Sequence, residues 1–512
     1  MTLQVPLTVR LHAEDNVVVA LADILPGTRI PEEGMTAAAH VPAGHKIASR
    51  VIAGDARVLR YGQIIGFATQ AIAPGDHVHT QNCEIRDFSR DYAFCADQRA
   101  TAFVDRAASF QGIRREDGRV ATRNYIGILT SVNCSAGVAR AIADHFRPNP
   151  LTGQGPLSDF PNIDGVVALT HKTGCGMASE GEPVELLRRT IAGYARHPNF
   201  AAVLLIGLGC EANQVARVMR SERLEDSEML QTLVIQQSGG TKATILDGIK
   251  RITALLPRAN KAAREPLPAS HITVGLQCGG SDGFSGLTAN PALGVASDLL
   301  VRHGGSVILS ETTEIYGAEH LLTRRAARRE IGEKLVGIIK WWEDYTARHH
   351  GSMDNNPSPG NKAGGLTTIL EKSLGAVAKA GSTNLVDVVR YGEAPQAKGL
   401  VFMDAPGFDP VSATGQVASG ANVICFTTGR GSAFGCKPVP SIKLSTNTAL
   451  YRRMPDDMDL DCGSILAGER VEDCGRRIFE MILRVASGEQ PKSEQMGFGE
   501  DEFAPWPLGA VV

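Results

Sequence analysis

The sequence lacks the features that mark membrane, secreted and nucleic-acid-binding proteins. No uninterrupted apolar stretch approaches about 18 residues, so no membrane-spanning helix is predicted. The first residues, Met1–Pro6, carry no basic segment followed by an apolar one, and we expect no signal peptide. The formal net charge is −3 and lysine and arginine form no run, which gives no electrostatic reason to expect nucleic-acid binding. We therefore expect a soluble, cytoplasmic protein.

Closely spaced cysteine pairs are also missing. None of the ten cysteines among 512 residues lies in a C-x-x-C arrangement, which argues against a disulfide framework, a zinc ribbon and haem attachment. Hydrophobic residues make up 43% and charged residues 21%, proportions typical of a protein with ample core. The length predicts about three domains.

Residues 1–85 have a strand-and-turn pattern with almost no helical period. Short apolar runs at 16–20, 46–52 and 64–68 are separated by turn signals such as Pro26-Gly27. We predict a small all-β domain. Residues 86–112 are polar and aperiodic, as expected of a linker.

From residue 113 onward, strand-like runs alternate with helical segments, which is the signature of α/β domains with parallel sheets. The segment 355–365 is too rich in turn formers to predict any element there. Strands are expected at 125–130, 165–170, 202–206, 271–276, 306–310, 385–389, 400–403 and 423–428, and a helix at 136–146.

The most informative segment is QCGGSDGFSG (277–286), which follows a strand-like run. Loops at the carboxyl ends of strands in open α/β sheets bind ligands, and glycines let backbone N–H groups approach an anion. Cys278 and Asp282 are residue types that ligate metals. The alternative is a tight turn with a buried, inert cysteine.

Three further cysteines, Cys134, Cys175 and Cys210, also sit in loops after strand-like runs. Together with Cys278 they are candidates for a mononuclear metal site that uses one or two of them, or for an Fe–S cluster if the fold brings several together. Packing without chemistry is the third possibility.

Other titratable residues lie at predicted strand ends. Glu311 and Glu314 are candidate metal ligands or general bases, or acidic residues that favour a helix N-terminus. His171 is a candidate base or ligand, or a hydrogen-bonded loop histidine. His45, in the β domain, is a further metal candidate, although a lone histidine there is more often structural.

The segment TTGRGS (427–432) is typical of an anion-binding loop, with Thr428 as a donor and Arg430 able to bind a carboxylate in two places. Lys362 is a second candidate anion contact. A nucleotide site is less favoured, because no P-loop or complete G-x-G-x-x-G motif follows a strand.

Several long motifs, in order, resemble those of the altronate dehydratase and galactarate dehydratase family. The N-terminal GHK (44–46) and YGQIIG (61–66) resemble the β-clip (SAF) domain of that family. The other motifs are DGRVATRN (117–124), GLGCE (207–211), CGGSD (278–282), TANP (288–291), NPSPGNK (356–362) and TGRG (428–431).

This resemblance implies a sugar-acid dehydratase that requires ferrous iron and reducing conditions. It implies a β-clip domain over 1–85, a linker over 86–112, an α/β middle domain over 113–265 that helps form a homodimer, and a Rossmann-like C-terminal domain over 266–512 with a metal site. YGAEH (316–320) and VVRYGE (388–393) are more similar to the altronate branch, whereas WWEDY (341–345) and ASG (418–420) are more similar to the galactarate branch. The substrate therefore stays open between the two acids.

The predicted reaction is loss of water from a 2,3-dihydroxy acid to give a 2-keto-3-deoxy acid. Mixed thiolate and carboxylate ligands suit Fe²⁺, with Mn²⁺ as a weaker substitute. Candidate metal ligands are Cys278, Asp282, Glu311 and Glu314, candidate bases are His171, Glu311 and Glu314, and candidate substrate contacts are Ser281, Asn361, Lys362, Thr428 and Arg430. The alternatives are a sulfo-lyase acting on a sulfolactate-like acid, and a non-catalytic protein that binds sugar acids.

Overall fold

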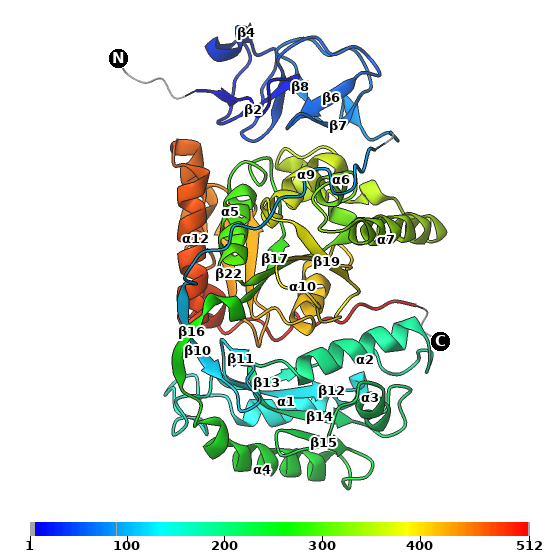
Figure 1. Ribbon diagram of the computed structural model, residues 1–512, viewed down its shortest axis with the longest axis vertical. Coiled ribbons are helices and arrows are strands. Elements are labelled where there is room, and N and C mark those ends of the chain that lie inside the picture. Colours follow the sequence, from blue (N-terminus) through cyan, green and yellow to red (C-terminus); the bar gives the residue numbers. More distant parts are fainter. Residues whose placement is uncertain (1–5, 89, 510–512) are drawn as a thin grey trace.

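The computed structural model describes residues 6–88 and 90–509, so most of the segment on which we expect no signal peptide lies outside the described residues. Figure 1 shows three stacked parts in a spatial order that differs from their order along the chain. The N-terminal β domain lies at the top, the C-terminal α/β domain at the centre and the middle domain at the bottom. The C-terminal domain therefore contacts both other parts.

The N-terminal part is built from strands alone apart from one 3₁₀ turn, Pro31–Glu33, within residues 6–85. Its sheets have the orders β1-β2-β5-β8, β6-β7-β9 and β3-β4, and all their pairings are antiparallel. The all-β prediction is confirmed. The strands are β1 (Thr8–Val9), β2 (Val17–Ala20), β3 (Arg29–Ile30), β4 (Met35–Thr36), β5 (Lys46–Ala48), β6 (Arg57–Arg60), β7 (Gln63–Ala68), β8 (His77–Val78) and β9 (Cys83–Glu84).

Residues 86–88 and 90–108 contain no helix or strand and run along the C-terminal domain in Figure 1. Side-chain contacts fasten this stretch: Arg90 pairs with Glu319 at 3.1 Å, and Asp97 pairs with Arg324 at 2.6 Å. The connection is thus extended and held against its neighbour.

The middle domain contains a parallel sheet of order β13-β12-β14-β15, flanked by helices, and a small antiparallel sheet of order β11-β10-β16. The expected strands and the helix at 136–146 are confirmed within two residues at each end. Its elements are β10 (Ser109–Arg114), β11 (Val120–Ala121), β12 (Tyr125–Thr130), α1 (Ala136–His145), β13 (Gly165–Leu169), α2 (Glu182–Ala195), β14 (Phe200–Gly207), α3 (Val215–Ser221), β15 (Leu230–Val234), α4 (Thr241–Ala259) and β16 (Arg264–Pro268).

The C-terminal domain is an open, wholly parallel sheet of seven strands in the order β19-β20-β18-β17-β21-β22-β23. Helices cover both faces, and the strands therefore read as nearly continuous apolar runs. The predicted α/β class with a large parallel sheet is confirmed. The strands are β17 (Thr273–Cys278), β18 (Ser306–Leu309), β19 (Leu385–Val389), β20 (Leu400–Met403), β21 (Val423–Thr428), β22 (Ser441–Ser445) and β23 (Leu460–Asp461).

The helices of this domain divide between the two faces of the sheet. Helices α5 and α12 pack together on one face with a shared apolar core, and α10 packs on β17 from the other. The helices are α5 (Ala289–Arg302), α6 (His320–Thr323), α7 (Arg329–Arg348), α8 (Pro359–Ala363), α9 (Ile369–Val377), α10 (Asp409–Ala418), α11 (Thr448–Arg453), α12 (Val471–Ala486) and α13 (Lys492–Gln495).

Helix α8 corrects the expectation that 355–365 contains no element. Ser358 caps the helix by accepting from the Asn361 backbone N–H, and the Asn361 side chain accepts from the Ser358 N–H in return. Pro359 occupies the first helical position, where its missing N–H costs nothing. The same turn-forming residues that argued against an element here form a reciprocal cap.

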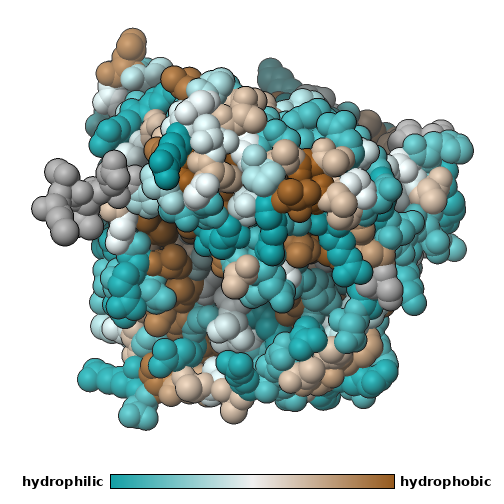
Figure 2. Space-filling model, turned by 90° about the horizontal axis from the view of Figure 1, so that it is seen from above, coloured by the Kyte–Doolittle hydropathy of each residue, from teal (hydrophilic) through white to brown (hydrophobic). Residues whose placement is uncertain are grey.

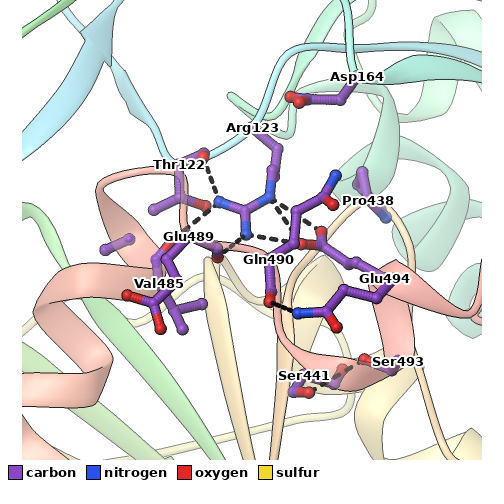
Figure 3. A network of polar contacts seen from close by, with 12 residues as sticks. Thr122, Arg123, Asp164, Pro438, Ser441, Val485, Glu489, Gln490, Ser493 and Glu494 are labelled. Carbon is purple, nitrogen blue, oxygen red and sulfur yellow. Dashed lines mark hydrogen bonds and ion pairs between the residues drawn. The ribbon is translucent and has the colours of Figure 1, made fainter. Parts of the chain in front are cut away.

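A buried arginine joins the middle domain to the C-terminal domain (Figure 3). Arg123 is 1% exposed, and its guanidinium donates to both carboxylate oxygens of Glu494 and to the carbonyls of Thr122, Val485 and Glu489. Such a two-pronged ion pair with every donor partnered is stronger than neutral hydrogen bonds and fixes direction as well as distance.

A second buried ion network joins the N-terminal domain to the C-terminal domain. Glu371, on α9, accepts from Lys46 at 2.9 Å and from Arg60, and all three side chains are at most 1% exposed. Lys46 and Arg60 also donate to the carbonyls of Gly365 and Gly283. A Cβ at Gly283 would fall 1.9 Å from the Gly44 carbonyl oxygen, so only glycine lets this loop approach the β domain so closely.

Seen from above, hydrophilic residues cover most of the surface, and hydrophobic residues form separate patches (Figure 2). Leu25 and Val51 are among the large apolar side chains exposed on the N-terminal domain. Within residues 6–88 and 90–509 no helix is long and apolar enough to cross a bilayer.

The Glu371 network predicts a stability effect. Glu371→Gln is expected to lower the free energy of unfolding by about 3–5 kcal/mol at pH 7, because it leaves two buried cations without a counter-charge. Burial raises the pKa of Glu371, but Lys46 and Arg60 outweigh this and hold it at about 2. The stabilisation is therefore complete above the unfolded pKa of about 4.3 and is lost as the pH falls toward 2.

Urea unfolding at several pH values, followed by circular dichroism, measures this effect. The matched control is Glu84→Gln, which removes an exposed partner of Arg86 and is expected to change stability by less than about 0.5 kcal/mol. Equal losses in the two variants would contradict the prediction.

Candidate active site

Three acidic or thiol side chains meet at the carboxyl ends of β17 and β18. Cys278 is the last residue of β17, and Glu311 and Glu314 follow β18, its parallel neighbour. One ligand atom from each lies within 4.8 Å of the others, and all three residues are buried. The backbone of Glu311 is left-handed, with φ 70°, a conformation that non-glycine residues adopt at a cost and that concentrates at functional sites.

Two lysines from the segment that begins with α9 neutralise this cluster. Lys372 Nζ lies 2.6 Å from Glu314 Oε1, and Lys379 Nζ lies 2.8 Å from Cys278 Sγ and 3.9 Å from Glu311 Oε2. The acidic side chains come from loops beside the sheet and the cations from a helix packed over them. The charge balance of the site therefore depends on how α9 packs over these loops.

The charges of the cluster follow from burial and from these lysines. Burial and the neighbouring Glu314 raise the pKa of Glu311 well above its usual range. Burial also raises the pKa of Glu314, but Lys372 outweighs it and keeps the pKa below the ordinary value. Burial raises the pKa of the Cys278 thiol to about 12. Glu314 is thus the anion of the group, and Glu311 carries a proton unless a cation binds.

A pocket of about 310 Å³ opens directly onto the cluster and is lined by Cys278, Glu314 and Lys372. Asn356, in its wall, donates to Glu314 at 2.7 Å and accepts from Lys372 at 2.8 Å. Asp409, the first residue of α10, also lines it, and burial together with the charge of Glu314 raises the pKa of Asp409 to about 7. The pocket thus holds a fixed cation, Lys372, beside a carboxyl group whose pKa is raised to about 7.

Asp282 is placed apart from this cluster. Its carboxylate accepts from Thr446 at 3.0 Å, from Ser285 at 3.0 Å, from the Phe284 N–H and from Asn447. These contacts tie together two loops of the C-terminal domain. The structure therefore separates Asp282 from the three residues with which it was grouped as a metal ligand.

Some of the predicted substrate contacts line the pocket, and others do not. Asn361 lines the pocket and donates to the Ser281 carbonyl at 2.9 Å, so the 281 and 361 loops meet there. Thr428 is fully buried and accepts from the Gly431 N–H, which holds the glycine-rich loop in shape. Arg430 is exposed and Lys362 half-buried, and neither lines the pocket.

His171 and three of the loop cysteines belong to the middle domain. His171 is buried, with Nε2 2.9 Å from the Thr130 carbonyl oxygen, and burial lowers its pKa to about 4. Cys134, Cys175 and Cys210 are all exposed and follow neighbouring strands of the four-stranded sheet. None of these four residues reaches the Cys278 cluster.

His45 lies in a different group. Its ring contacts His77 and His79 at the surface of the N-terminal domain that faces the 361–365 loop. The motif His77-Val78-His79 was the available signal, since residues two apart in a strand point to the same side. The sequence offered no comparable signal for Lys372 and Asp409, which line the pocket through the packing of α9 and α10, or for Lys379, which contacts the cluster from the turn after α9.

The residues at the Cys278 cluster fit a bound metal ion. Both carboxylate oxygens of Glu311 are buried without a hydrogen-bond partner, which is costly for an acid unless a proton or a cation accompanies it. A thiol and two carboxylates form a mixed donor set suited to a first-row transition ion rather than to Ca²⁺ or Mg²⁺. Cys278, Glu311 and Glu314 are the ligands this arrangement supplies.

A buried acid–base pocket at the carboxyl end of a parallel sheet defines an enzyme that acts on a small anionic substrate. Comparison with known proteins identifies it further. Three family descriptions match in succession: the altronate/galactarate dehydratase SAF domain over 6–86, the second domain of D-galactarate dehydratase/altronate hydrolase over 112–260, and the D-galactarate/altronate dehydratase C-terminal domain over 269–511. The chain belongs to the altronate and galactarate dehydratase family, as its motifs indicate, and it is a hydro-lyase.

Relatives match across nearly the full chain. Altronate dehydratases of Bacillus subtilis and Escherichia coli are 36% and 37% identical, each covering 96% of this chain and 97% of the relative. The galactarate dehydratase (L-threo-forming) of Escherichia coli is 38% identical over 96% of this chain and 94% of its own. A more distant relative, the β subunit of (2R)-sulfolactate sulfo-lyase of Chromohalobacter salexigens, is 33% identical over 77% of this chain and 96% of its own.

Thiol accessibility gives a direct test of this geometry. Iodoacetamide is expected to label Cys134, Cys175 and Cys210 in the native protein well before Cys278, because only an accessible thiolate reacts. Mass spectrometry of the digested protein measures the order of labelling. Cys462, buried in the same domain as Cys278, serves as the protected control. Labelling of Cys278 as fast as Cys210 would contradict the buried site.

Proposed function

We propose that this protein removes water from a sugar acid, either an altronate-type aldonate or a galactarate-type aldarate, to give a 2-keto-3-deoxy sugar acid. The observation that carries the proposal is the pocket where Cys278, Glu311 and Glu314 meet two buried lysines. The family membership makes a sugar acid the substrate class. The names of the relatives support both acids equally, and incubation with each acid, described below, separates them.

The reaction requires removal of a weakly acidic proton next to a carboxylate. Asp409 is the base in this proposal, because its carboxyl group lines the pocket and its pKa is raised to about 7 by burial and the charge of Glu314. Lys372 and Lys379 place fixed positive charge where the enolate-like charge develops. Asp409, once protonated, is the acid beside the departing hydroxyl group.

We propose Fe²⁺ at Cys278, Glu311 and Glu314, with Mn²⁺ as a partial substitute. Such an ion supplies Lewis-acid stabilisation of the substrate carboxylate and hydroxyl oxygens. A thiol ligand also accounts for a requirement for reducing conditions, because its oxidation removes a ligand. Asn361, beside the Ser281 backbone, is placed to hold substrate hydroxyls at the pocket wall. The homodimer and the cytoplasmic location remain expectations from the sequence.

A sulfo-lyase is the second candidate. The sulfolactate relative matches 77% of this chain, and elimination of sulfite begins with the same removal of a proton next to a carboxylate. The full-length match to dehydratases favours water as the leaving group.

Incubation of the anaerobic, Fe²⁺-loaded protein with altronate, galactarate and sulfolactate separates the candidates. We expect a 2-keto acid from one of the two sugar acids and no sulfite, measured by a 2-keto acid assay and by sulfite detection. Sulfite release would favour the second candidate, and no product from any acid would contradict the catalytic proposal.

Loss of a cluster residue is expected to remove metal and activity together. Cys278→Ser combined with Glu311→Gln should reduce both bound Fe²⁺ and kcat/KM by at least about 100-fold, because two of three ligands are lost. Elemental analysis and a turnover assay measure the two effects. Cys462→Ser is the matched control, since that thiol is fully buried in the same domain away from the pocket. Full activity in the double variant would contradict the site.

The role of Asp409 predicts a pH dependence. As a base it must be deprotonated, so kcat/KM is expected to fall as the pH drops through the pKa of Asp409, which is about 7 without metal and is lowered by a cation bound at Glu314. Asp409→Asn should lower kcat by about 10²–10⁴-fold and abolish this ionisation from the pH profile. Asp404→Asn, which changes a buried carboxylate hydrogen-bonded to Trp342 and Thr312, is the control. An unchanged profile in Asp409→Asn would assign the base elsewhere.

A further inference from the structure

Three histidines of the N-terminal domain lie on one face of a single pair of strands. Strands β5 and β8 pair antiparallel with Lys46 opposite Val78 and Ile47 opposite His77. Continued by one residue, this register places His45 opposite His79, which directly follows β8. The strand pairing therefore brings the segments that carry the three histidines side by side.

The side chains converge as the register requires. One ring nitrogen from each histidine lies within 4.8 Å of the others, and His45 Nδ1 is 3.0 Å from His77 Nε2. The ring centroids of His79 lie 4.8 Å from His45 and 5.5 Å from His77. Three imidazole nitrogens this close can be brought onto one tetrahedral metal ion, with bonds of about 2.0–2.1 Å, by small side-chain rotations.

The hydrogen bonds of the three histidines favour a role for their ring nitrogens as metal ligands rather than as donors to other protein groups. His45 Nε2 lies 3.3 Å from the Ala363 carbonyl oxygen, and donation to that oxygen leaves Nδ1 as an acceptor, 3.0 Å from His77 Nε2. His79 Nδ1 is buried without any hydrogen-bond partner. A buried nitrogen without a partner, beside two rings whose nitrogens face each other, requires a further group to satisfy it.

The electrostatic surroundings agree with this geometry. Burial lowers the pKa of His77 to about 4 and that of His79 to about 3, so both rings are neutral at pH 7. The titratable groups that act on the three rings are Lys46, which pairs with Glu371, together with Asp23 and His40. Neutral imidazole is the form that binds metal.

We propose that His45, His77 and His79 form a second metal centre that holds a divalent first-row transition ion, separate from the Cys278 cluster. Three protein nitrogens leave at least one coordination position open to water or an anion. Because His45 also contacts Ala363 of helix α8, which carries Asn361, a bound ion would stiffen the contact between the β domain and the pocket wall. The centre does not depend on the proposed reaction.

Metal titration of the full-length chain tests the centre. Zn²⁺ and Fe²⁺ are titrated separately into metal-free protein that carries Cys278→Ser and Glu311→Gln, so that the other cluster does not contribute. One equivalent is expected to bind, and Co²⁺ is expected to give the visible absorption of a nitrogen-ligated ion. His77→Ala with His79→Ala should weaken binding at least 100-fold, whereas His40→Ala, an exposed histidine in the same domain, should leave it unchanged.

The outcomes separate cleanly. Circular dichroism of the metal-free variants establishes whether they are folded. If the double variant is unfolded, His79→Gln replaces it, because glutamine keeps more of the volume of the histidine side chain. Equal metal affinity with and without His77 and His79, or no binding of any of the three ions, would overturn the proposal. Tighter binding of Zn²⁺ than of Fe²⁺, or the reverse, identifies the ion the centre selects.

Discussion

The carboxylate of Glu371 is the constraint on which the arrangement of this protein depends. A fully buried anion must be neutralised, and both of its cationic partners, Lys46 and Arg60, come from the β domain. The β domain must therefore dock on α9 for the C-terminal domain to be stable, and docking brings Gly44 and His45 against the loops around Gly283 and Ala363. These contacts fix the N-terminal domain in one orientation relative to the C-terminal domain.

The same helix connects this docking to the chemistry. Glu371 faces the β domain, whereas the next residue, Lys372, turns to Glu314, and Lys379 in the following turn reaches Cys278. Helix α9 thus carries opposite charges to two different partners. Any shift of the β domain that moves Glu371 also moves the cations that set the ionisation of the pocket.

Much of this could be predicted from the sequence, for physical reasons. Buried parallel strands are apolar on both faces, so β12, β19, β20 and β21 were recognisable from composition alone. Glu311 and Glu314 were recognisable because polar residues after such a strand lie at the ligand-binding edge.

What the sequence did not reveal about the placement of these residues has physical reasons as well. Asp282 has the residue type of a metal ligand, but hydrogen bonds from Thr446 and Ser285 fix the direction of its side chain. Thr446 is far away in the sequence, and neither hydroxyl group stands out as a partner of Asp282. Lys372 and Lys379 look like ordinary helical lysines until the helix is packed. His171 follows a strand, yet that strand belongs to another sheet.

The pairing of β10 with β16 has a consequence for how this architecture arose. These strands are the entry and exit of the middle domain, and residues 109–113 lie directly opposite 264–268. Neighbouring antiparallel Cα atoms are only about 4.5–5.5 Å apart, so the chain enters and leaves the domain at one place. The middle domain therefore has the connectivity of an insertion, although it also shares an apolar core with the C-terminal domain.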